Sequence, residues 1–175
     1  STTTTAAVVE SAGSGFALTE VALDDLRPDE VRVRVVAAGI CHTDLGVAGG
    51  HLPFPLPGVL GHEGAGIVEE VGAAVTKVAA GDQVLLSYTS SGRCENCRQG
   101  HPAYCDTWLP SNLIGGERAD GTSPISRGGV PLGGHFFGQS SFAHHAVVDE
   151  RSVVKAPADA PLDLLAPLGC GVMTG

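Results

Sequence analysis

The sequence predicts a mostly β fold, a barrel or a sandwich of short strands, on three observations. Apolar and polar residues alternate with a period of two in several short runs, Gly, Pro, Asp or Ser bounds each run, and segments with a helical period are scarce. Such alternation is typical of strands with one buried face. Many short strands at this spacing favour a barrel or sandwich over a parallel α/β sheet.

The clearest strand is VRVRVVAAG at 31–39, in which three valines alternate with two arginines. This pattern predicts one face in the core and the other in solvent. Four more short β-rich runs are found at TTAAVV (4–9), GAGIVEEVG (64–72), DQVLLSY (82–88) and FAHHAVVDE (142–150).

Helical segments are expected at two places only. One covers residues 42–49, and the other is a short turn through PLDLLAP, which the side chain of Asp159 can cap before Gly169. Residues 106–138 are rich in Gly, Pro and Ser and show no sustained period. We expect this segment to form an irregular surface excursion, because it is too long for an ordinary connection.

Composition and charge restrict the partners. The 175 residues are 43% hydrophobic, enough for one core, and 10 Lys+Arg against 19 Asp+Glu give a net charge of −9. No basic stripe is available for phosphates, which argues against nucleic acid and anionic membranes as partners and favours small molecules. With neither a signal-peptide pattern nor an uncharged apolar stretch long enough to cross a bilayer, we expect a cytoplasmic protein.

In the reducing cytoplasm, five cysteines indicate metal binding or catalysis more than disulfides. Cys94, Cys97 and Cys105 form a knuckle with the spacing of metal ligands, but Ser91 stands three residues before Cys94, and a neutral hydroxyl is a poor zinc ligand. Two interpretations remain, a structural zinc site and three free thiols. His101 could be the fourth ligand only if the loop bends to bring it in.

A second group is scattered along the chain: Cys41, His62 and Cys170. Taken singly, each could be a buried cysteine or an ordinary hydrogen-bonded histidine. Taken together, two thiolates and one imidazole leave a tetrahedral Zn²⁺ nearly neutral, with one open position for a substrate. That is the pattern of a catalytic zinc site that activates an alcohol.

No segment has the sequence pattern of a nucleotide-binding loop. GAGIVE at 64–69 has the first two glycines of a dinucleotide fingerprint, but Glu69 stands where the third should be, and a strand follows where a helix is needed. We therefore expect the chain by itself to be unable to hold a nucleotide.

Several motifs together resemble the catalytic domain of the zinc-dependent medium-chain alcohol dehydrogenases: GICHTD, GHEGAGIVEEVG, GDQVLL, the CENC knuckle and GCGVMTG. GVLGHEGAG and GQSSFAHHAVV most resemble the aryl (benzyl) alcohol dehydrogenase branch. The resemblance runs from about Ala6 to Gly175. It implies a GroES-like β-barrel over residues 1–175, with a knuckle lobe at about 89–110 and an irregular loop at about 106–138. The family's Rossmann nucleotide-binding domain would follow residue 175.

The resemblance also implies roles at the zinc site. Cys41, His62 and Cys170 would hold the catalytic zinc, with Glu63 beside it as an occasional ligand. Three further implied roles belong to neighbouring residues: Asp44 would orient His62, Thr43 would accept the proton of the alcohol, and His42 would meet the cofactor pyrophosphate or be a surface histidine. Gly46 stands where the family's proton relay usually ends in His, so the proton would leave by water, by a cofactor ribose hydroxyl or by His51.

Around that site, Thr174 would lie at the nicotinamide. Tyr88, Phe54 and Leu56 would line an apolar pocket for an aromatic or allylic alcohol, or be ordinary core residues. The implied activity is oxidation of a primary alcohol to the aldehyde, with hydride transfer to NAD or NADP, in a protein that forms homo-oligomers.

Two alternatives remain, a zinc-free reductase relative with the same barrel and a non-catalytic zinc-binding module. The trio of ligands argues against the first, because nothing but a metal needs all three. The open position argues against the second, because a structural zinc wants four protein ligands.

Overall fold

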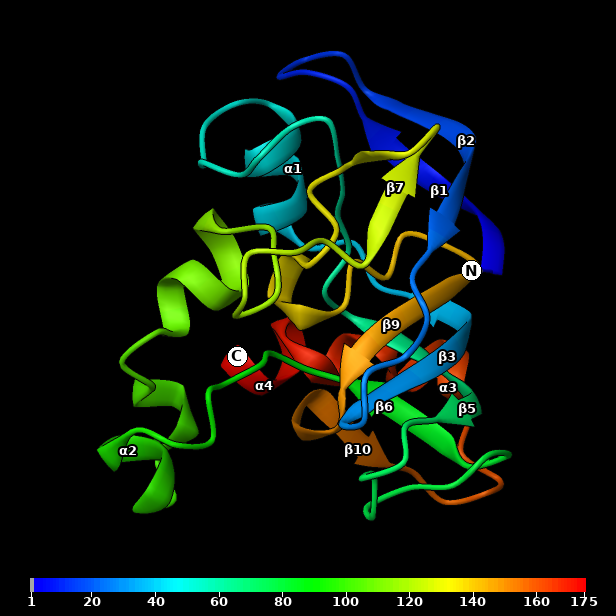
Figure 1. Ribbon diagram of the computed structural model, residues 1–175, viewed down its shortest axis with the longest axis vertical. Helices are drawn as coiled ribbons and strands as arrows, with labels where there is room; N and C mark the ends of the chain where they lie inside the picture. The colour runs from blue at the N-terminus through cyan, green and yellow to red at the C-terminus, as the bar shows by residue number, and fades with distance from the viewer. Residues whose placement is uncertain (1) are drawn as a thin grey trace.

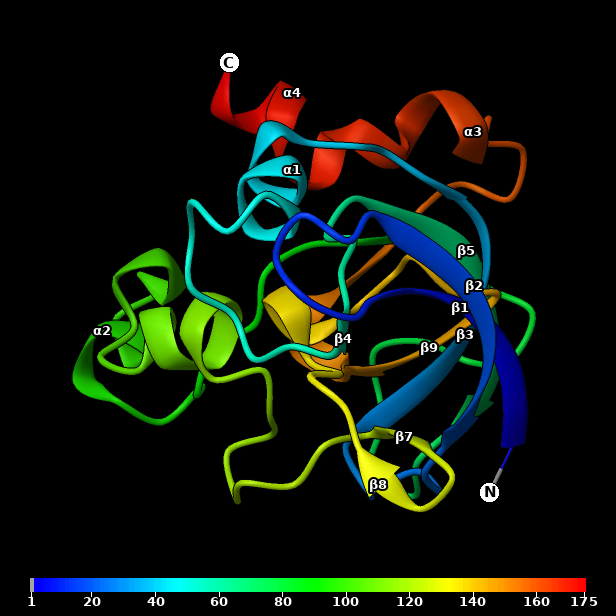
Figure 2. The same cartoon turned by 90° about the horizontal axis from the view of Figure 1, so that it is seen from above.

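The computed structural model describes residues 2–175, which fold into two five-stranded sheets with the strand orders β4-β1-β2-β7-β8 and β10-β6-β5-β3-β9. All the strand pairs within them are antiparallel, and the two sheets curl around one interior (Figures 1 and 2). The strands are β1 (Thr2–Val9), β2 (Phe16–Leu23), β3 (Glu30–Ala38), β4 (Gly58–Val59), β5 (Gly64–Val71), β6 (Gln83–Leu86), β7 (Ile125–Arg127), β8 (Val130–Pro131), β9 (His145–Asp149) and β10 (Val153–Lys155).

Helices are short and lie outside the sheets. They are α1 (His42–Ala48), α2 (Glu95–Arg98), α3 (Leu162–Leu165) and α4 (Gly171–Thr174), with helical turns at Pro102–Tyr104, Pro110–Ile114, Phe136–Gly138, Glu150–Ser152 and Ala166–Gly169. The lobe that carries α2 projects to one side of the barrel in both views (Figures 1 and 2). Within residues 2–175, none of the helices has the length and apolar character needed to cross a bilayer. The predicted mostly β fold with few short helices is confirmed.

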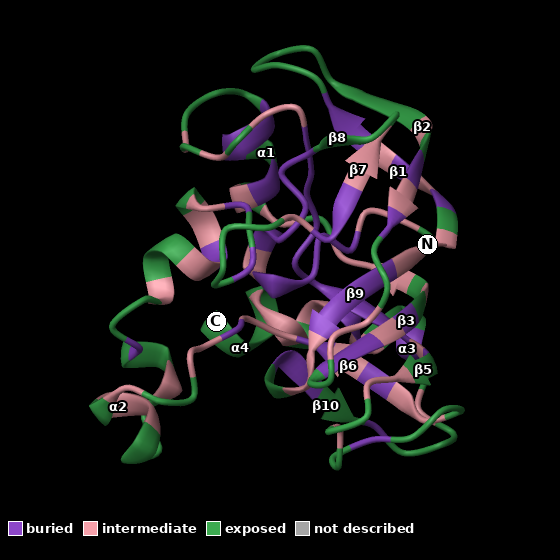
Figure 3. Ribbon diagram, viewed as in Figure 1, coloured by how far each residue is buried: buried purple, intermediate pink, exposed green. Residues whose placement is uncertain are grey.

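The core is built from the alternating faces of the strands. Val31 and Val33 of β3 are fully buried, pair with β5 on one side and β9 on the other, and pack with Val84, Leu86 and Val148. Burying a valine or leucine side chain stabilises the fold by about 1.5–3 kcal/mol relative to leaving it exposed. Buried residues accordingly follow the strands and inner loops, whereas the α2 lobe is mostly exposed or half-buried (Figure 3).

All five β-rich runs predicted from the sequence contain a strand, but five further strands were not expected from their patterns. The longest of these is β2, whose first half is exposed and whose core contribution is limited to Val21 and Leu23. It forms an antiparallel hairpin with β1, in which Val9 lies opposite Phe16 and Thr2 lies opposite Leu23. Alternation alone does not reveal a strand that is buried over only part of its length.

The expected helix at 42–49 is present as α1, and its start is fixed by Asp44. The Oδ2 atom of Asp44 accepts a hydrogen bond from the Cys41 N–H at 2.9 Å, which closes a capping box. The predicted cap at Asp159 is wrong. Helix α3 begins after Pro161, which is its N-cap, and no side chain caps it, because Asp159 lies two residues too early to reach the free N–H groups of the first turn.

Residues 106–138 contain no long element, yet they are more than a surface excursion. Ile125 in this segment is buried in the core, and the Arg118 guanidinium is buried against the Glu30 carboxylate, with N–O distances of 2.6 and 2.9 Å. Asn112 is also buried and hydrogen-bonds the backbone of Thr89 through both its amide oxygen and its amide nitrogen. The segment therefore packs against the barrel through side chains that the sequence pattern does not mark as inward-facing.

Candidate metal centre

Four side chains from three distant segments meet at one point. The ligand atoms of Cys41, His62, Glu63 and Cys170 all lie within 4.8 Å of one another. Cys41 precedes α1, His62 and Glu63 lie in the loop before β5, and Cys170 joins the last helical turn to α4. This ligand cluster thus depends on the whole fold.

The imidazole of His62 indicates whether the cluster suits a metal ion. The residue is 1% exposed, its Nδ1 lies 3.1 Å from Asp44 Oδ1, and its Nε2 is buried with no hydrogen-bond partner. A buried polar atom without a partner costs about 1–3 kcal/mol. A cation among the neighbouring thiol and carboxylate groups would satisfy that nitrogen, so the donor set fits a divalent metal ion.

Asp44 holds both the histidine and the loops around it. Its carboxylate is fully buried and accepts hydrogen bonds from the Cys41 N–H at 2.9 Å and the Gly61 N–H at 3.0 Å, besides the contact with His62 Nδ1. Burial lowers the pKa of His62, but the hydrogen bond and charge of Asp44 outweigh it and raise this pKa above its ordinary value. With Nδ1–H facing the carboxylate, Nε2 presents a lone pair to the cluster.

Glu63 is buried between the two glycine-rich motifs. Its Oε1 accepts a hydrogen bond from the Gly171 N–H at 2.7 Å. A Cβ atom at Gly39 would lie 2.1 Å from Glu63 Oε2, so the GICHTD loop can approach the carboxylate only with glycine at this position. Gly171 is limited in the same way, because a Cβ atom there would lie 3.0 Å from Glu63 Oε1.

The two thiols of the cluster have opposite acidities. Burial raises the pKa of Cys41, but hydrogen bonds from the Thr43 backbone and hydroxyl, together with His62, outweigh it and lower this pKa. Burial and the negative charge of Cys41 raise the pKa of Cys170 to about 11. Ionising one thiol thus opposes ionising the other, and a cation between them would stabilise both thiolates.

The neighbouring residues named from the sequence lie at different depths. Thr43 is half-buried, with Oγ1 3.7 Å from Cys41 Sγ, so its hydroxyl lies at the edge of the cluster. His42 is exposed at the start of α1, and Thr174 is exposed in α4, where its N–H donates to the Cys170 carbonyl at 2.8 Å.

A chain of ring contacts leads away from the cluster. The ring of Phe137 stacks on His62 with centroids 4.5 Å apart and an interplanar angle of 24°. Phe136 contacts both rings and also Phe54, whose ring centroid is 4.9 Å away. Trp108 continues from Phe137 at 5.7 Å and reaches Tyr88 at 6.2 Å. We call this set the aromatic wall: Phe54, Tyr88, Trp108, Phe136 and Phe137.

Two of the three pocket residues proposed from the sequence, Phe54 and Tyr88, belong to the aromatic wall. Leu56, the third, is half-buried and packs against the core group around Phe136 without a ring contact. Sequence reasoning missed Phe136, Phe137 and Trp108. The pair of phenylalanines in GHFFG was visible, but only the fold shows that it lies on His62.

The knuckle lobe forms a second, smaller cluster. The ligand atoms of Cys94, Cys97 and Cys105 lie within 4.8 Å of one another, and Ser91 Oγ is 3.4 Å from Cys105 Sγ and 3.7 Å from Cys97 Sγ. Burial raises the pKa of Cys105, but the hydroxyls and backbone N–H groups of Ser91 and Thr107 outweigh it and bring this pKa to about 6. His101, considered above as a fourth ligand, is exposed and is not part of the cluster.

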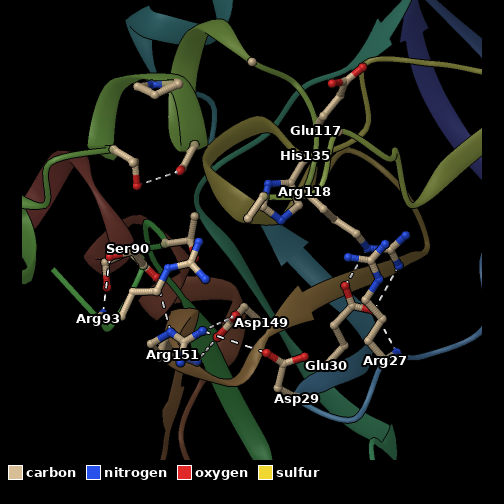
Figure 4. Close-up of a pocket in the computed structure, with 18 residues that line it drawn as sticks. Arg27, Asp29, Glu30, Ser90, Arg93, Glu117, Arg118, His135, Asp149 and Arg151 are labelled. Atoms are coloured by element: carbon tan, nitrogen blue, oxygen red, sulfur yellow. Dashed lines mark hydrogen bonds and ion pairs between the residues drawn. The ribbon is translucent and has the colours of Figure 1, made fainter.

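A polar pocket of about 470 Å³ lies beside the knuckle, and none of the four ligand-cluster residues lines it (Figure 4). Two of its arginines already have carboxylate partners. Arg118 is paired with Glu30, and Arg151 with Asp149 at 2.9 Å. Since acidic residues match the arginines around this pocket, its electrostatics do not select an anion.

The fold and the site together define a class: a β-barrel domain with a Cys/His/Glu/Cys cluster that could hold a metal ion and that lies against an aromatic wall. Residues 27–158 match the family model for the alcohol dehydrogenase GroES-like domain, and the chain belongs to this family.

The similar proteins are alcohol dehydrogenases. The chain is 48% identical over 170 residues to geraniol dehydrogenase of Castellaniella defragrans, an alignment that covers 97% of this chain and 45% of the relative. Among solved structures, an alcohol dehydrogenase zinc-binding domain protein from Burkholderia ambifaria superposes with a TM-score of 0.95 at 50% identity, over 99% of this chain and 47% of that one. Benzyl alcohol dehydrogenase from Acinetobacter calcoaceticus gives a TM-score of 0.92 at 43% identity, over 100% and 47%. The chain thus spans about half the length of the curated relatives it matches.

Proposed function

We propose that this chain is the catalytic domain of a zinc-dependent alcohol dehydrogenase that oxidises a primary aryl or allylic alcohol to the aldehyde. The observation that carries the proposal is the buried, unpartnered Nε2 of His62, directed at two thiols and a carboxylate. Cys41, His62 and Cys170 would hold the zinc ion, with Glu63 as an occasional ligand. Zinc bound there acts as a Lewis acid on the hydroxyl oxygen of the alcohol and lowers its pKa.

The residues around the ligand cluster orient its histidine and transfer the proton of the alcohol. Asp44 orients His62 by accepting its Nδ1–H, which directs the other ring nitrogen, Nε2, toward the cluster. Thr43, at the edge of the cluster, accepts the hydroxyl proton of the alcohol and passes it outward, because the pKa of a threonine hydroxyl is too high for it to keep the proton. The exposed imidazole of His51 is one outlet, besides water and a ribose hydroxyl of the cofactor.

The substrate class rests on the aromatic wall. Its rings form an apolar surface that begins at His62, where the reacting carbon would lie. A planar group next to the carbinol carbon, whether a benzene ring or a double bond, can stack against such a surface. Two of the similar proteins carry the names geraniol dehydrogenase and benzyl alcohol dehydrogenase, and both names denote primary alcohols with an unsaturated carbon next to the carbinol.

The hydride acceptor would be NAD⁺ or NADP⁺. The chain offers no glycine-rich phosphate loop, so we place the nucleotide in a Rossmann domain encoded after residue 175, with His42 near its pyrophosphate and Thr174 near its nicotinamide. Both residues are exposed, as contact with such a domain requires. We further propose a cytoplasmic homo-oligomer.

The test is a dehydrogenase assay on the protein expressed from its gene through the natural stop codon. Benzyl alcohol, cinnamyl alcohol and geraniol are offered with NAD⁺ and with NADP⁺, and ethanol serves as the comparison substrate. We expect reduction of one nucleotide with the unsaturated alcohols, its loss in Cys41→Ser, and a fall of about 10²–10⁴-fold in kcat/KM for Thr43→Val but not Thr43→Ser. No alcohol-dependent reduction of either nucleotide, or full activity in Cys41→Ser, would contradict the proposal.

A further inference from the structure

Gln139 is a fully buried amide with an unusual set of partners. It is 1% exposed, and all three of its side-chain hydrogen bonds go to main-chain groups. Its Oε1 accepts from the Gly64 N–H at 3.0 Å, and its Nε2 donates to the His62 carbonyl at 3.0 Å. These two main-chain groups flank Glu63, so the amide fixes the backbone on both sides of Glu63 and directly after His62.

The same amide reaches the segment that carries Cys170. Nε2 of Gln139 also donates to the Ser87 carbonyl at 3.1 Å, and the Ser87 hydroxyl donates to the Gly169 carbonyl at 3.0 Å. Gly169 immediately precedes Cys170. A continuous hydrogen-bonded bridge therefore joins the loop of His62 and Glu63 to the loop of Cys170 through Gln139 and Ser87.

The turn that presents Gln139 has a strained backbone. Phe137 and Ser140 have φ angles of 50° and 45°, a left-handed conformation that side chains other than glycine rarely adopt. The Ser140 hydroxyl stabilises this turn, because it accepts from the Phe136 N–H at 2.9 Å and donates to the Val59 carbonyl at 2.7 Å. One consequence is that Phe137 stacks on the His62 ring while Gln139 holds the His62 backbone.

Glycine at position 64 is needed for this arrangement. A Cβ atom at Gly64 would lie 2.7 Å from the Cβ of Ser141 and 3.0 Å from Gln139 Oε1. The close approach of the 139–141 segment to the start of β5 therefore depends on a residue without a side chain. The amide of Gln139 thereby satisfies the buried N–H group of Gly64 and the buried carbonyl group of His62.

We propose that Gln139 is a positioning residue of the ligand cluster: through Ser87, its amide sets the distance between the His62–Glu63 loop and the Cys170 loop. This inference rests on the proposed function, since it takes the cluster to be a metal site. A residue that aligns ligands from behind changes metal affinity and coordination geometry, as outer partners of metal ligands do. A residue that only fills space changes stability alone.

The experiment compares Gln139→Met, which removes all three hydrogen bonds at similar length, with Gln83→Met. Gln83 also donates its amide to a main-chain carbonyl, that of Ala158 at 2.9 Å, but in an exposed contact that involves none of the cluster residues. Both variants are made in a Cys94→Ser/Cys97→Ser parent, which removes ligands of the knuckle. Zinc affinity is measured by chelator competition, the cobalt-substituted protein by its absorption spectrum, and folding by circular dichroism.

We expect Gln139→Met to weaken zinc binding by about 10–100-fold and to alter the cobalt bands, with Gln83→Met unchanged. Ser87→Ala removes only the hydrogen bond to the Gly169 carbonyl and is a smaller change. It tests the positioning role if Gln139→Met does not fold. We expect it to weaken binding by less than Gln139→Met and to shift the cobalt bands. Folded variants with the parent's zinc affinity and cobalt spectrum would overturn the positioning role. A parent that binds neither metal would overturn the proposed function of the cluster, and this inference with it.

Discussion

The ligand cluster and the knuckle both contain cysteine thiols but are assembled in opposite ways. The residues of the ligand cluster come from three distant segments and are held by buried groups, of which Asp44 and Gln139 are the main ones. The knuckle takes three cysteines from twelve consecutive residues in a lobe that is mostly exposed. It has a serine hydroxyl where a fourth donor would be.

This difference in assembly determines how each site depends on the fold. A cluster built from distant segments exists only when the barrel is folded, so metal binding there stabilises the entire domain. A local cluster needs only its own loop, so metal binding there orders the lobe and little else. Substitutions at His62, Ser91 and Asp44 test that contrast.

The largest effect is expected from His62→Ala. This change removes the donor at the centre of the ligand cluster and leaves Asp44 with a buried charge that has lost a partner. We expect about one equivalent of zinc fewer per chain, measured by elemental mass spectrometry. His101→Ala, which removes an exposed histidine of the knuckle lobe, is the control and should leave the zinc content unchanged. Equal zinc in both variants would contradict the assignment of the cluster.

Ser91→Cys should strengthen the knuckle. The serine hydroxyl lies within 3.7 Å of two of the thiols, so a thiol at this position would complete a four-thiolate site. If each ligand supplies about a quarter of the roughly 10–16 kcal/mol of a structural zinc site, the gain is on the order of 100-fold in affinity. Ser90→Cys adds a thiol one residue away and serves as the control. Equal zinc affinity in the two variants, measured by chelator competition, would show that Ser91 is not at the fourth corner.

Asp44→Asn is expected to weaken zinc binding at the ligand cluster by about 10–100-fold, because a neutral amide orients His62 less well than a carboxylate. Asp82→Asn is the matched control: Asp82 accepts a hydrogen bond from the Ala79 N–H in a turn remote from the cluster. Chelator competition measures the zinc affinity of each variant. An affinity in Asp44→Asn no lower than in Asp82→Asn would remove Asp44 from the site.

His135→Gln should change how stability depends on pH. Burial lowers the pKa of His135 to about 4 from an ordinary value of 6.5, although a hydrogen bond to the Ser111 backbone and the charge of Glu30 oppose this shift. The nearby Arg118 and Arg27 add to the lowering. Because the folded state binds the proton more weakly than the unfolded state, this contribution to stability is complete above about pH 6.5 and falls as the pH drops toward 4.

At pH 5 the loss relative to pH 8 is about 2 kcal/mol of unfolding free energy, and the variant should lack this share of the pH dependence. Urea unfolding of metal-free protein at both pH values measures it, so that release of metal does not contribute. A variant whose stability falls between pH 8 and pH 5 as much as that of the wild type would contradict the prediction.

Local pattern was enough for part of this account. The strand of 31–39 could be predicted from its valines, and Cys41, His62 and Cys170 from their donor types and from the resemblance of the surrounding motifs to a known family. The structure brings these three side chains together with Glu63 and Asp44. The strand β2 was not predicted, because its first half is exposed, although it pairs with β1, the strand directly before it.

The site residues that the sequence analysis missed also depend on contacts between segments that are distant in the chain. In the sequence, Phe137 is one of two adjacent phenylalanines. The structure shows that its backbone is left-handed and that its ring stacks on His62. Gln139 reads as a polar loop residue, whereas the fold buries its amide against three main-chain groups. Asp159 shows the opposite failure, because a good capping residue has no role when Pro161 starts the helix after it.

The most direct test of the central claim is X-ray absorption at the zinc edge on the chain with Cys94→Ser and Cys97→Ser. We predict about one zinc ion per chain, with about two sulfur ligands near 2.3 Å and the remaining nitrogen or oxygen ligands near 2.0–2.2 Å. That result would place zinc at Cys41, His62 and Cys170. Absence of zinc from this protein, or a ligand shell with no sulfur, would contradict the claim that the cluster built from distant segments is a metal centre.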